Sequence, residues 1–283
     1  MVTAWKALGL TVVFALGLAG TASAAVYGGD TAQRTPFSIT LTNSGQVKSI
    51  GTLWRAQCQS GRTYDFGGML TATSKAPSVI VPGDNPLLAR VKAGKLSGRA
   101  LGSVNFGDQG SGAITQKVSG RLKPTTATGT WSAHMDVLDA EAKTIDSCDT
   151  GTFRWAARRG PNVYAGSTTQ GDPVVVIARK NRMKLDLFGF GWQAGCTPDG
   201  FWHIGEEFGN FPLTTNGAFG DTFTNDYPFS DNSGKNSFTY KIDGSLKKKR
   251  GSGTLSVTLA ATDTAGATTQ TCDSTSVRWS VTQ

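Results

Sequence analysis

The chain of 283 residues carries one pattern twice, and this internal repeat constrains its fold more than any other feature. Residues 26–36 and 163–173 share the pattern V-Y-x-G-x-T-x-Q-x-x-P. Such self-similarity predicts two copies of one folding unit. The later matching residues, first copy against second, are Trp54 with Trp192, Cys58 with Cys196, Lys117 with Lys241, Gly120 with Gly244, Lys123 with Lys247, Cys148 with Cys272, and Trp155 with Trp279.

Each copy holds one early and one late cysteine. An even number of cysteines in an exported chain is typical of disulfide bonds. Because each copy should fold by itself, we expect the bridges Cys58–Cys148 and Cys196–Cys272. Closing loops of this length would remove unfolded-state entropy worth roughly 4–5 kcal/mol for each bridge. Free thiols, or a bridge between the copies such as Cys58–Cys196, are the alternatives.

The amino-terminal residues have the pattern of an export signal. Lys6 is followed by an apolar run over residues 7–19, and the small residues Ala22 and Ala24 occupy the two positions that a signal peptidase reads. The run is shorter than a typical membrane span. We therefore expect a signal peptide over residues 1–24, no transmembrane segment in the mature chain, and a secreted, extracellular protein.

The remainder of the chain predicts strands and no helices. Apolar and polar residues alternate over residues 37–41, 131–137, 238–242 and 255–259, a period that buries one face of a strand. Charged residues make up only 17% and glycine is abundant, which is typical of β-rich domains. We predict an all-β fold of two tandem homologous antiparallel domains, residues 25–160 and 161–283. Each is a β-sandwich or a flattened β-barrel with one internal disulfide.

Three motifs of the repeat carry a resemblance to a known family. They are Y-x-G-x-T-x-Q from Tyr27 and Tyr164, W-x-x-x-C from Trp54 and Trp192, and C-D-[ST]-x-x-x-R-W from Cys148 and Cys272. In these motifs the chain resembles a tandem β-rich repeat of exported proteins of actinobacterial type. The resemblance implies secretion and a duplicated β-domain. It implies no reaction, because that family has no assigned activity.

No catalytic set is repeated in the two copies. The two histidines, His134 and His203, fall at unrelated positions, and no nucleophile-elbow pattern supports a serine triad. Glu206 and Glu207 are adjacent on a predicted strand, so they should point to opposite faces and cannot serve as a glycosidase pair. His203 and Glu207 share a face, and a metal pair is the alternative to a solvated strand face there.

Residues 221–232 are expected to form a polar loop between two strands. The carboxylates of Asp221, Asp226 and Asp231 are the candidate ligands for Ca2+, because oxygen ligands at short spacing suit this ion. Their spacing is not that of an EF-hand. An ordinary polar turn is the alternative, and no other cofactor is expected.

Aromatic and basic residues are the remaining candidates for binding. The rings of Trp202, Tyr227 and Phe229 could form a stacking surface for a sugar, or pack in the core instead. The basic residues favour anionic polymers, although an exposed turn also needs solvating charge. No aromatic residues alternate with them, so a specific nucleic-acid site is not expected. The basic clusters are Arg90, Lys92, Lys95 and Arg99 in the first copy, and Lys247, Lys248, Lys249 and Arg250 at a predicted hairpin tip in the second.

These features favour an exported, non-enzymatic structural or binding protein that presents two β-domains to envelope or extracellular polymers, either anionic polymers or polysaccharides. The alternative is a carbohydrate-active protein, a sugar-binding module or a glycoside hydrolase, with its site in the second copy. A secreted inhibitor is a third class, for which the sequence offers no positive signal.

Overall fold

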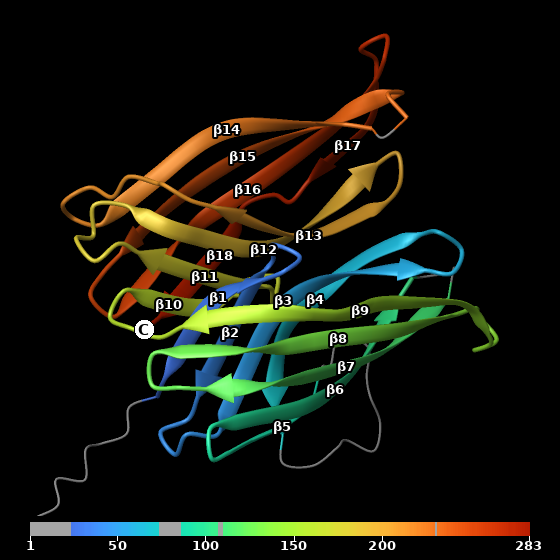
Figure 1. Cartoon of the computed structure of the whole chain (residues 1–283). Helices are drawn as coiled ribbons and strands as arrows, with labels where there is room; N and C mark the ends of the chain where they lie inside the picture. The colour runs from blue at the N-terminus through green and yellow to red at the C-terminus, as the bar shows by residue number, and fades with distance from the viewer. Residues whose placement is uncertain (1–23, 74–85, 107–109, 230) are drawn as a thin grey trace, which may run out of the picture.

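The computed structural model describes residues 24–73, 86–106, 110–229 and 231–283. This part of the chain is all-β, as predicted, and forms two β-units that lie one on the other (Figure 1). The expected signal peptide lies outside the described residues, apart from Ala24. Within the described part, no helix is long and apolar enough to cross a membrane.

The first unit is a closed barrel in which each strand pairs with the next, and β9 closes it against β1 and β3. Neighbouring strands run antiparallel except β4 and β5, which are parallel. The strands are β1 (Val26–Thr31), β2 (Pro36–Leu41), β3 (Val47–Cys58), β4 (Thr63–Ala72), β5 (Pro86–Lys92), β6 (Lys95–Asn105), β7 (Ser111–Leu122), β8 (Thr126–Leu138) and β9 (Thr144–Arg158).

The second unit is a nine-stranded sheet. Its main path ends at β13 and β14, which do not pair with each other, and β17 closes the strands between by pairing with both β12 and β16. Where the first unit inserts β5 between β4 and β6, the second passes from β13 through residues 209–217 to β14. Its strands are β10 (Val163–Thr168), β11 (Pro173–Ala178), β12 (Leu185–Thr197), β13 (Phe201–Phe208), β14 (Ala218–Pro228), β15 (Gly234–Leu246), β16 (Arg250–Asp263), β17 (Thr268–Asp273) and β18 (Val277–Thr282).

The period-two runs form strands, as predicted. In β8 the side chains of Trp131, Ala133, Met135 and Val137 are buried, while the residues between them are only partly buried. One expectation was wrong: residues 221–228 belong to the edge strand β14 and do not form a loop. Their aromatic and β-branched residues favour a strand. Because an edge strand is exposed to solvent, it also accommodates the polar residues that suggested a loop.

Each unit has its own apolar core. Trp54, Trp131 and Trp155 are at most 2% exposed in the first core, and Trp192 and Trp279 are equally buried in the second. Phe37 stacks on Trp155 with ring centroids 4.4 Å apart. The first core takes its residues from positions 25–157 and the second from positions 164–281.

The two units repeat the same long-range hydrogen bonds. The hydroxyl of Tyr27 donates to the carbonyl of Lys123, and that of Tyr164 donates to the carbonyl of Lys247. The side-chain amide of Gln33 bonds both backbone groups of Arg55, and the amide of Gln170 does the same to Gln193. The residues shared by the two copies therefore make equivalent contacts that hold the start of each unit against its later strands.

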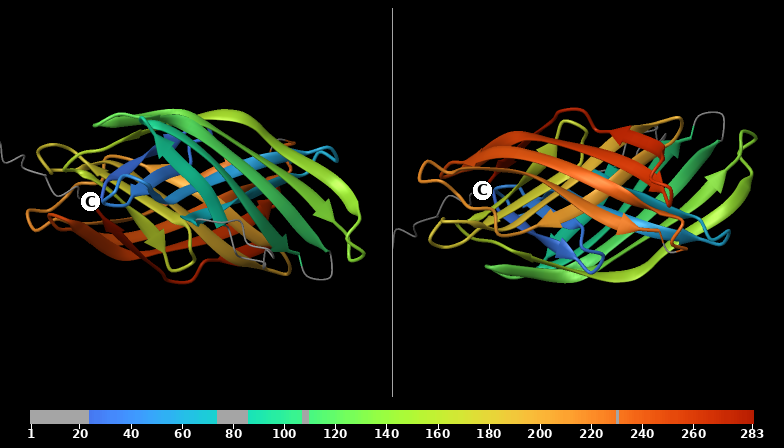
Figure 2. Two further views of the ribbon diagram at one scale, coloured as in Figure 1. Left: turned by 90° about the horizontal axis from the view of Figure 1, so that it is seen from below. Right: turned by 90° about the horizontal axis from the view of Figure 1, so that it is seen from above.

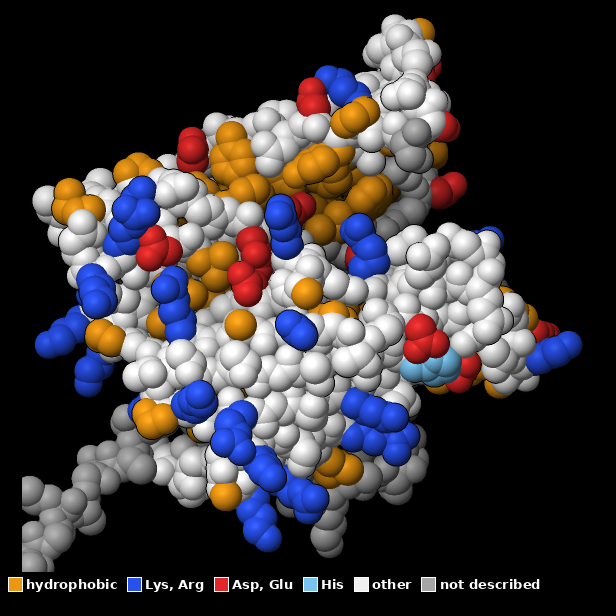
Figure 3. Space-filling model, in the orientation of Figure 1, with side chains coloured by type: hydrophobic (Ala, Val, Ile, Leu, Met, Phe, Trp, Pro, Cys, Tyr) orange, Lys and Arg blue, Asp and Glu red, His pale blue; other side chains and the backbone are white. Residues whose placement is uncertain are grey.

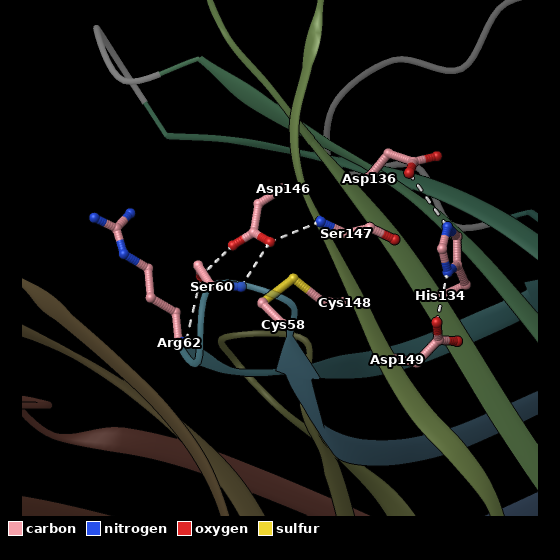
Figure 4. Close-up of a disulfide and its surroundings, with 9 residues drawn as sticks. All are labelled: Cys58, Ser60, Arg62, His134, Asp136, Asp146, Ser147, Cys148 and Asp149. Atoms are coloured by element: carbon pink, nitrogen blue, oxygen red, sulfur yellow. Dashed lines mark hydrogen bonds and ion pairs between the residues drawn. A yellow bond between two sulfur atoms is a disulfide. The ribbon is translucent and has the colours of Figure 1, made fainter.

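Both expected disulfides are present, and no described cysteine is free. Cys58–Cys148 links β3 to β9, and Cys196–Cys272 links β12 to β17. Around the first bridge, Asp146 accepts a hydrogen bond from the Ser60 hydroxyl, and His134 lies between two carboxylates (Figure 4). Each bridge joins residues that are already opposite one another in a sheet, so it reinforces the closure of its own unit.

A third apolar cluster lies between the units and is built from Val26, Val163, Ala165, Val175 and Ile177. The paired strands β1 and β2 pack here on β10 and β11, and Figure 2 shows one unit in front of the other from either end of the stack. Glycine permits this close approach, because a Cβ atom on Gly28 would lie 2.8 Å from Cγ1 of Val175.

Candidate functional site

The aromatic residues predicted to bind a ligand are partly brought together. Trp202 on β13 and Tyr227 on β14 both contact the ring of Phe238, with centroids 5.7 and 5.6 Å apart. Phe238 itself is buried, and Tyr227 is 47% exposed. Phe229 follows β14 in a turn and is half-buried. Core packing, the alternative role, thus accounts for part of this aromatic set.

The three aspartates considered for calcium do not converge. Asp221 and Asp226 are five residues apart on β14, so their side chains point to opposite faces. Asp226 pairs with Lys235 at 2.6 Å, and Asp231 accepts the backbone N–H of Ser233. The one group of three potential metal-ligand atoms among the described residues, Cys58, Asp146 and Cys148, includes a disulfide whose sulfurs cannot act as thiolates. The arrangement therefore offers no support for a calcium site.

His203 and the two adjacent glutamates have separate surroundings. Nε2 of the buried His203 lies 2.6 Å from Oδ1 of the buried Asp172, a partner that the sequence did not reveal. On the other face of β13, Glu206 accepts a hydrogen bond from the Tyr240 hydroxyl at 3.0 Å. Burial raises the pKa of Glu206, and burial together with the charge of Asp30 raises the pKa of Glu207 to about 8. Glu206 and Glu207 are adjacent on β13, so their side chains point to opposite faces of the strand.

The basic hairpin tip forms as predicted. Lys247, Lys248 and Lys249 connect β15 to β16, and all three side chains are exposed, as is that of Arg250. The backbone is fixed, because the carbonyl of Lys247 accepts hydrogen bonds from Tyr164 and Arg182. Charged side chains keep an exposed turn hydrated, so this cluster has an ordinary structural explanation.

A larger basic surface covers the outer face of β5, β6 and β7. These three strands contain no Asp or Glu. Lys and Arg side chains gather low in the view of Figure 3, over these strands of the first unit. We call this surface the cationic face, and its six exposed residues are Arg90, Lys92, Lys95, Arg99, Lys117 and Arg121.

The register of the sheet places like charges directly opposite one another. Lys95 on β6 lies opposite Lys92 on β5 and opposite Arg121 on β7. Arg99 on β6 lies opposite Lys117 on β7. Neighbouring strands are about 4.8 Å apart, and the two rows of cations are separated by four residues, roughly 13 Å along the strands. Like charges in such cross-strand positions destabilise a sheet.

The cationic face also lacks internal neutralisation. None of the ion pairs found among the described residues involves one of its six cations. Sequence reasoning had grouped Arg90, Lys92, Lys95 and Arg99 but missed Lys117 and Arg121. Lys117 and Arg121 are four residues apart, a spacing that places both on one face of a strand. The strand pairing that completes the rows is not visible in the sequence.

Comparison of the chain with protein-family models, curated proteins and solved structures finds no match in any of the three.

Proposed function

We propose that the chain is an exported, non-enzymatic protein that binds an anionic envelope or extracellular polymer along the cationic face of its first unit. The observation that carries this proposal is the pair of like-charged rows, Lys92–Lys95–Arg121 and Arg99–Lys117. The amino-terminal sequence supports export, and the two disulfides are compatible with an oxidising compartment.

A polyanion would convert the unfavourable arrangement of these charges into a favourable one. Exposed cations opposite one another repel, but phosphate, sulfate or carboxylate groups laid across the rows would neutralise several at once. Polymer counterions released by the contact would add to the affinity and make it depend on salt. A surface of one sign also raises the local concentration of an oppositely charged polymer.

The second unit supports a functional origin for these cations. If the two halves are copies of one unit, each cross-strand pair of the first unit has a counterpart in the second. The pair Arg99 and Lys117 corresponds to Thr222 and Lys241. The pair Lys95 and Arg121 corresponds to Ala218 and Ser245. The second unit therefore forms its sheet with one cation where the first has four. The fold does not need the charges that the first unit displays.

The test is binding of the full chain to a soluble polyanion, dextran sulfate, with uncharged dextran as the comparison polymer. The double variant Arg99→Gln/Lys117→Gln should bind the polyanion more weakly, and the slope of log affinity against log salt should fall by roughly 1–2. The matched control Lys247→Gln/Lys248→Gln removes the same charge from the hairpin tip and should change binding much less. Equal losses in the two double variants would show that only net charge matters, and the proposal would then be wrong.

A further inference from the structure

A cleft of about 1210 Å³ lies between the two units. The first unit contributes one side from β3, β4, β6 and β7. The second unit contributes the other side from the turn between β10 and β11 and from the hairpin of β12 and β13. Small-molecule sites usually measure about 300–1,000 Å³. This cleft therefore has room for a ligand longer than a single small molecule. It is distinct from the cationic face, whose six cations do not line it.

The cleft has aromatic side chains on both sides. Tyr64 and Phe66 on β4 hold their rings nearly parallel, with an interplanar angle of 16° and centroids 5.8 Å apart. Phe106 contacts both rings at 5.6 and 6.2 Å. From the second unit, Phe201 reaches the cleft and is 63% exposed. The exposed ring of Phe201 offers an apolar face to a ligand in the cleft.

The charged groups in the cleft are already paired. Arg55 bonds Asp65 through Nε at 2.8 Å and through a second guanidinium nitrogen at 3.0 Å. His203 is held by Asp172, which also accepts a hydrogen bond from the side chain of Gln193. A charged ligand would have to compete with these partners. An uncharged ligand with many hydroxyl groups can bind while these ion pairs stay in place.

Polar groups suited to such a ligand also line the cleft. The buried hydroxyl oxygen of Ser103 has no hydrogen-bond partner among the described residues. The amides of Gln116, Gln170 and Gln193 lie along the wall, and Gln116 accepts a hydrogen bond from the indole N–H of Trp54. A buried hydroxyl without a partner costs free energy. Because this oxygen has almost no exposed surface, a ligand hydroxyl would bond it once the Ser103 side chain turns toward the cleft.

The two sides are held in fixed relation at the base of the cleft. The backbone N–H of Met69 on β4 donates to the carbonyl of Gly171, which joins the units directly at 3.0 Å. Gly67 and Gly68 have positive φ angles of 153° and 133°, and a Cβ on Gly67 would lie within 2.5 Å of Cα of Leu53. The backbone conformation of β4 beside the aromatic rings therefore depends on glycine.

From these observations we infer that the cleft binds a segment of an uncharged polysaccharide. Sugar rings would lie against the apolar faces of Tyr64, Phe66 and Phe201, and their hydroxyl groups would bond Ser103 and the glutamine amides. The inference stands apart from binding to the cationic face, because the two surfaces have different residues and different chemistry.

The experiment is affinity electrophoresis of the full chain through gels containing neutral polysaccharides, namely soluble starch, a mannan and a soluble β-glucan. At least one should retard the protein. Phe201→Ala and Tyr64→Ala should each weaken that binding about threefold to tenfold, as expected for loss of one ring contact. Met183→Ala is the matched control, because Met183 is 62% exposed outside the cleft, and it should leave binding unchanged.

The dependence of binding on salt concentration distinguishes the cleft from the cationic face. Retardation by the neutral polymer should be insensitive to salt and should persist in the Arg99→Gln/Lys117→Gln variant. Far-UV circular dichroism checks that Tyr64→Ala folds, and Phe201→Ala replaces an exposed side chain and serves as the second variant. Failure of all three polysaccharides to retard the chain would overturn the inference, as would retardation that neither ring variant reduces.

Discussion

Glu207 shows how packing of the two units changes the chemistry of a single residue. It lies on β13, its Oε1 atom is buried without a hydrogen-bond partner among the described residues, and Asp30 of the first unit adds negative charge nearby. Burial is the main cause of its raised pKa, and the charge of Asp30 is the second. The folded chain therefore favours the protonated form of a group that ionises readily once unfolded.

The sign of the resulting pH effect follows from proton linkage. Between the ordinary pKa of about 4.3 and the folded value of about 8, the folded state binds more protons than the unfolded state, so the free energy of unfolding falls as pH rises. Glu207→Gln removes this loss. Because the side chain is partly exposed, we expect the variant to be more stable than the parent by on the order of 1–2 kcal/mol above about pH 8, and nearly equal below about pH 4.

Urea unfolding of both proteins across this pH range measures the difference. Taking the difference between the two curves cancels the contributions of other titrating groups. A gap that stays constant with pH would contradict this account of Glu207.

The like charges of the cationic face should lower the stability of the strands that carry them. Lys95 faces a cation on each neighbouring strand, so Lys95→Gln should raise the free energy of unfolding by about 0.2–1 kcal/mol at low salt. The gain should shrink in high salt, where exposed charges are screened. Thermal or urea unfolding at two salt concentrations measures it.

Lys235→Gln is the control for that measurement. Lys235 is paired with Asp226, so the same substitution there should be neutral or slightly destabilising. If Lys95→Gln were the more destabilising of the two, the like-charged rows would not carry the repulsion that we ascribe to them.

The strands also show what the sequence could predict. Alternation identified β2, β8, β15 and β16, because a buried face repeats every second residue. It failed at β14, where an edge strand carries Asp221 and Asp226 on its exposed positions and reads as a loop. Of the candidate site, the cations of β5 and β6 were evident from the sequence. Their alignment with Lys117 and Arg121 was not, because register is set by pairing across the sheet.

In the whole molecule, close contact between the two units depends on Gly28, because glycine has no Cβ atom. A Cβ there would lie 2.8 Å from Val175 and 3.1 Å from Val163, both in the second unit. We expect Gly28→Val to cost about 1–3 kcal/mol of stability, since overpacking forces both sheets apart. Gly195→Val is the control, because a Cβ on Gly195 would meet no atom within 4 Å. Denaturant unfolding of both variants tests the difference, and equal losses would contradict it.

The apolar cluster between the units has a consequence for how such a chain came to be. Its buried residues lie on β1 of one half and on β10 and β11 of the other, and β2 also packs on β10 and β11. Two identical proteins that meet through the same patch form a symmetric dimer. If the two halves are copies of one unit, a gene for that unit would encode a protein that dimerises through this patch, and fusing two such genes would join the two subunits in one chain. Residues 24–160 expressed alone should accordingly sediment as dimers, and a well-behaved monomer at high concentration would refute this history.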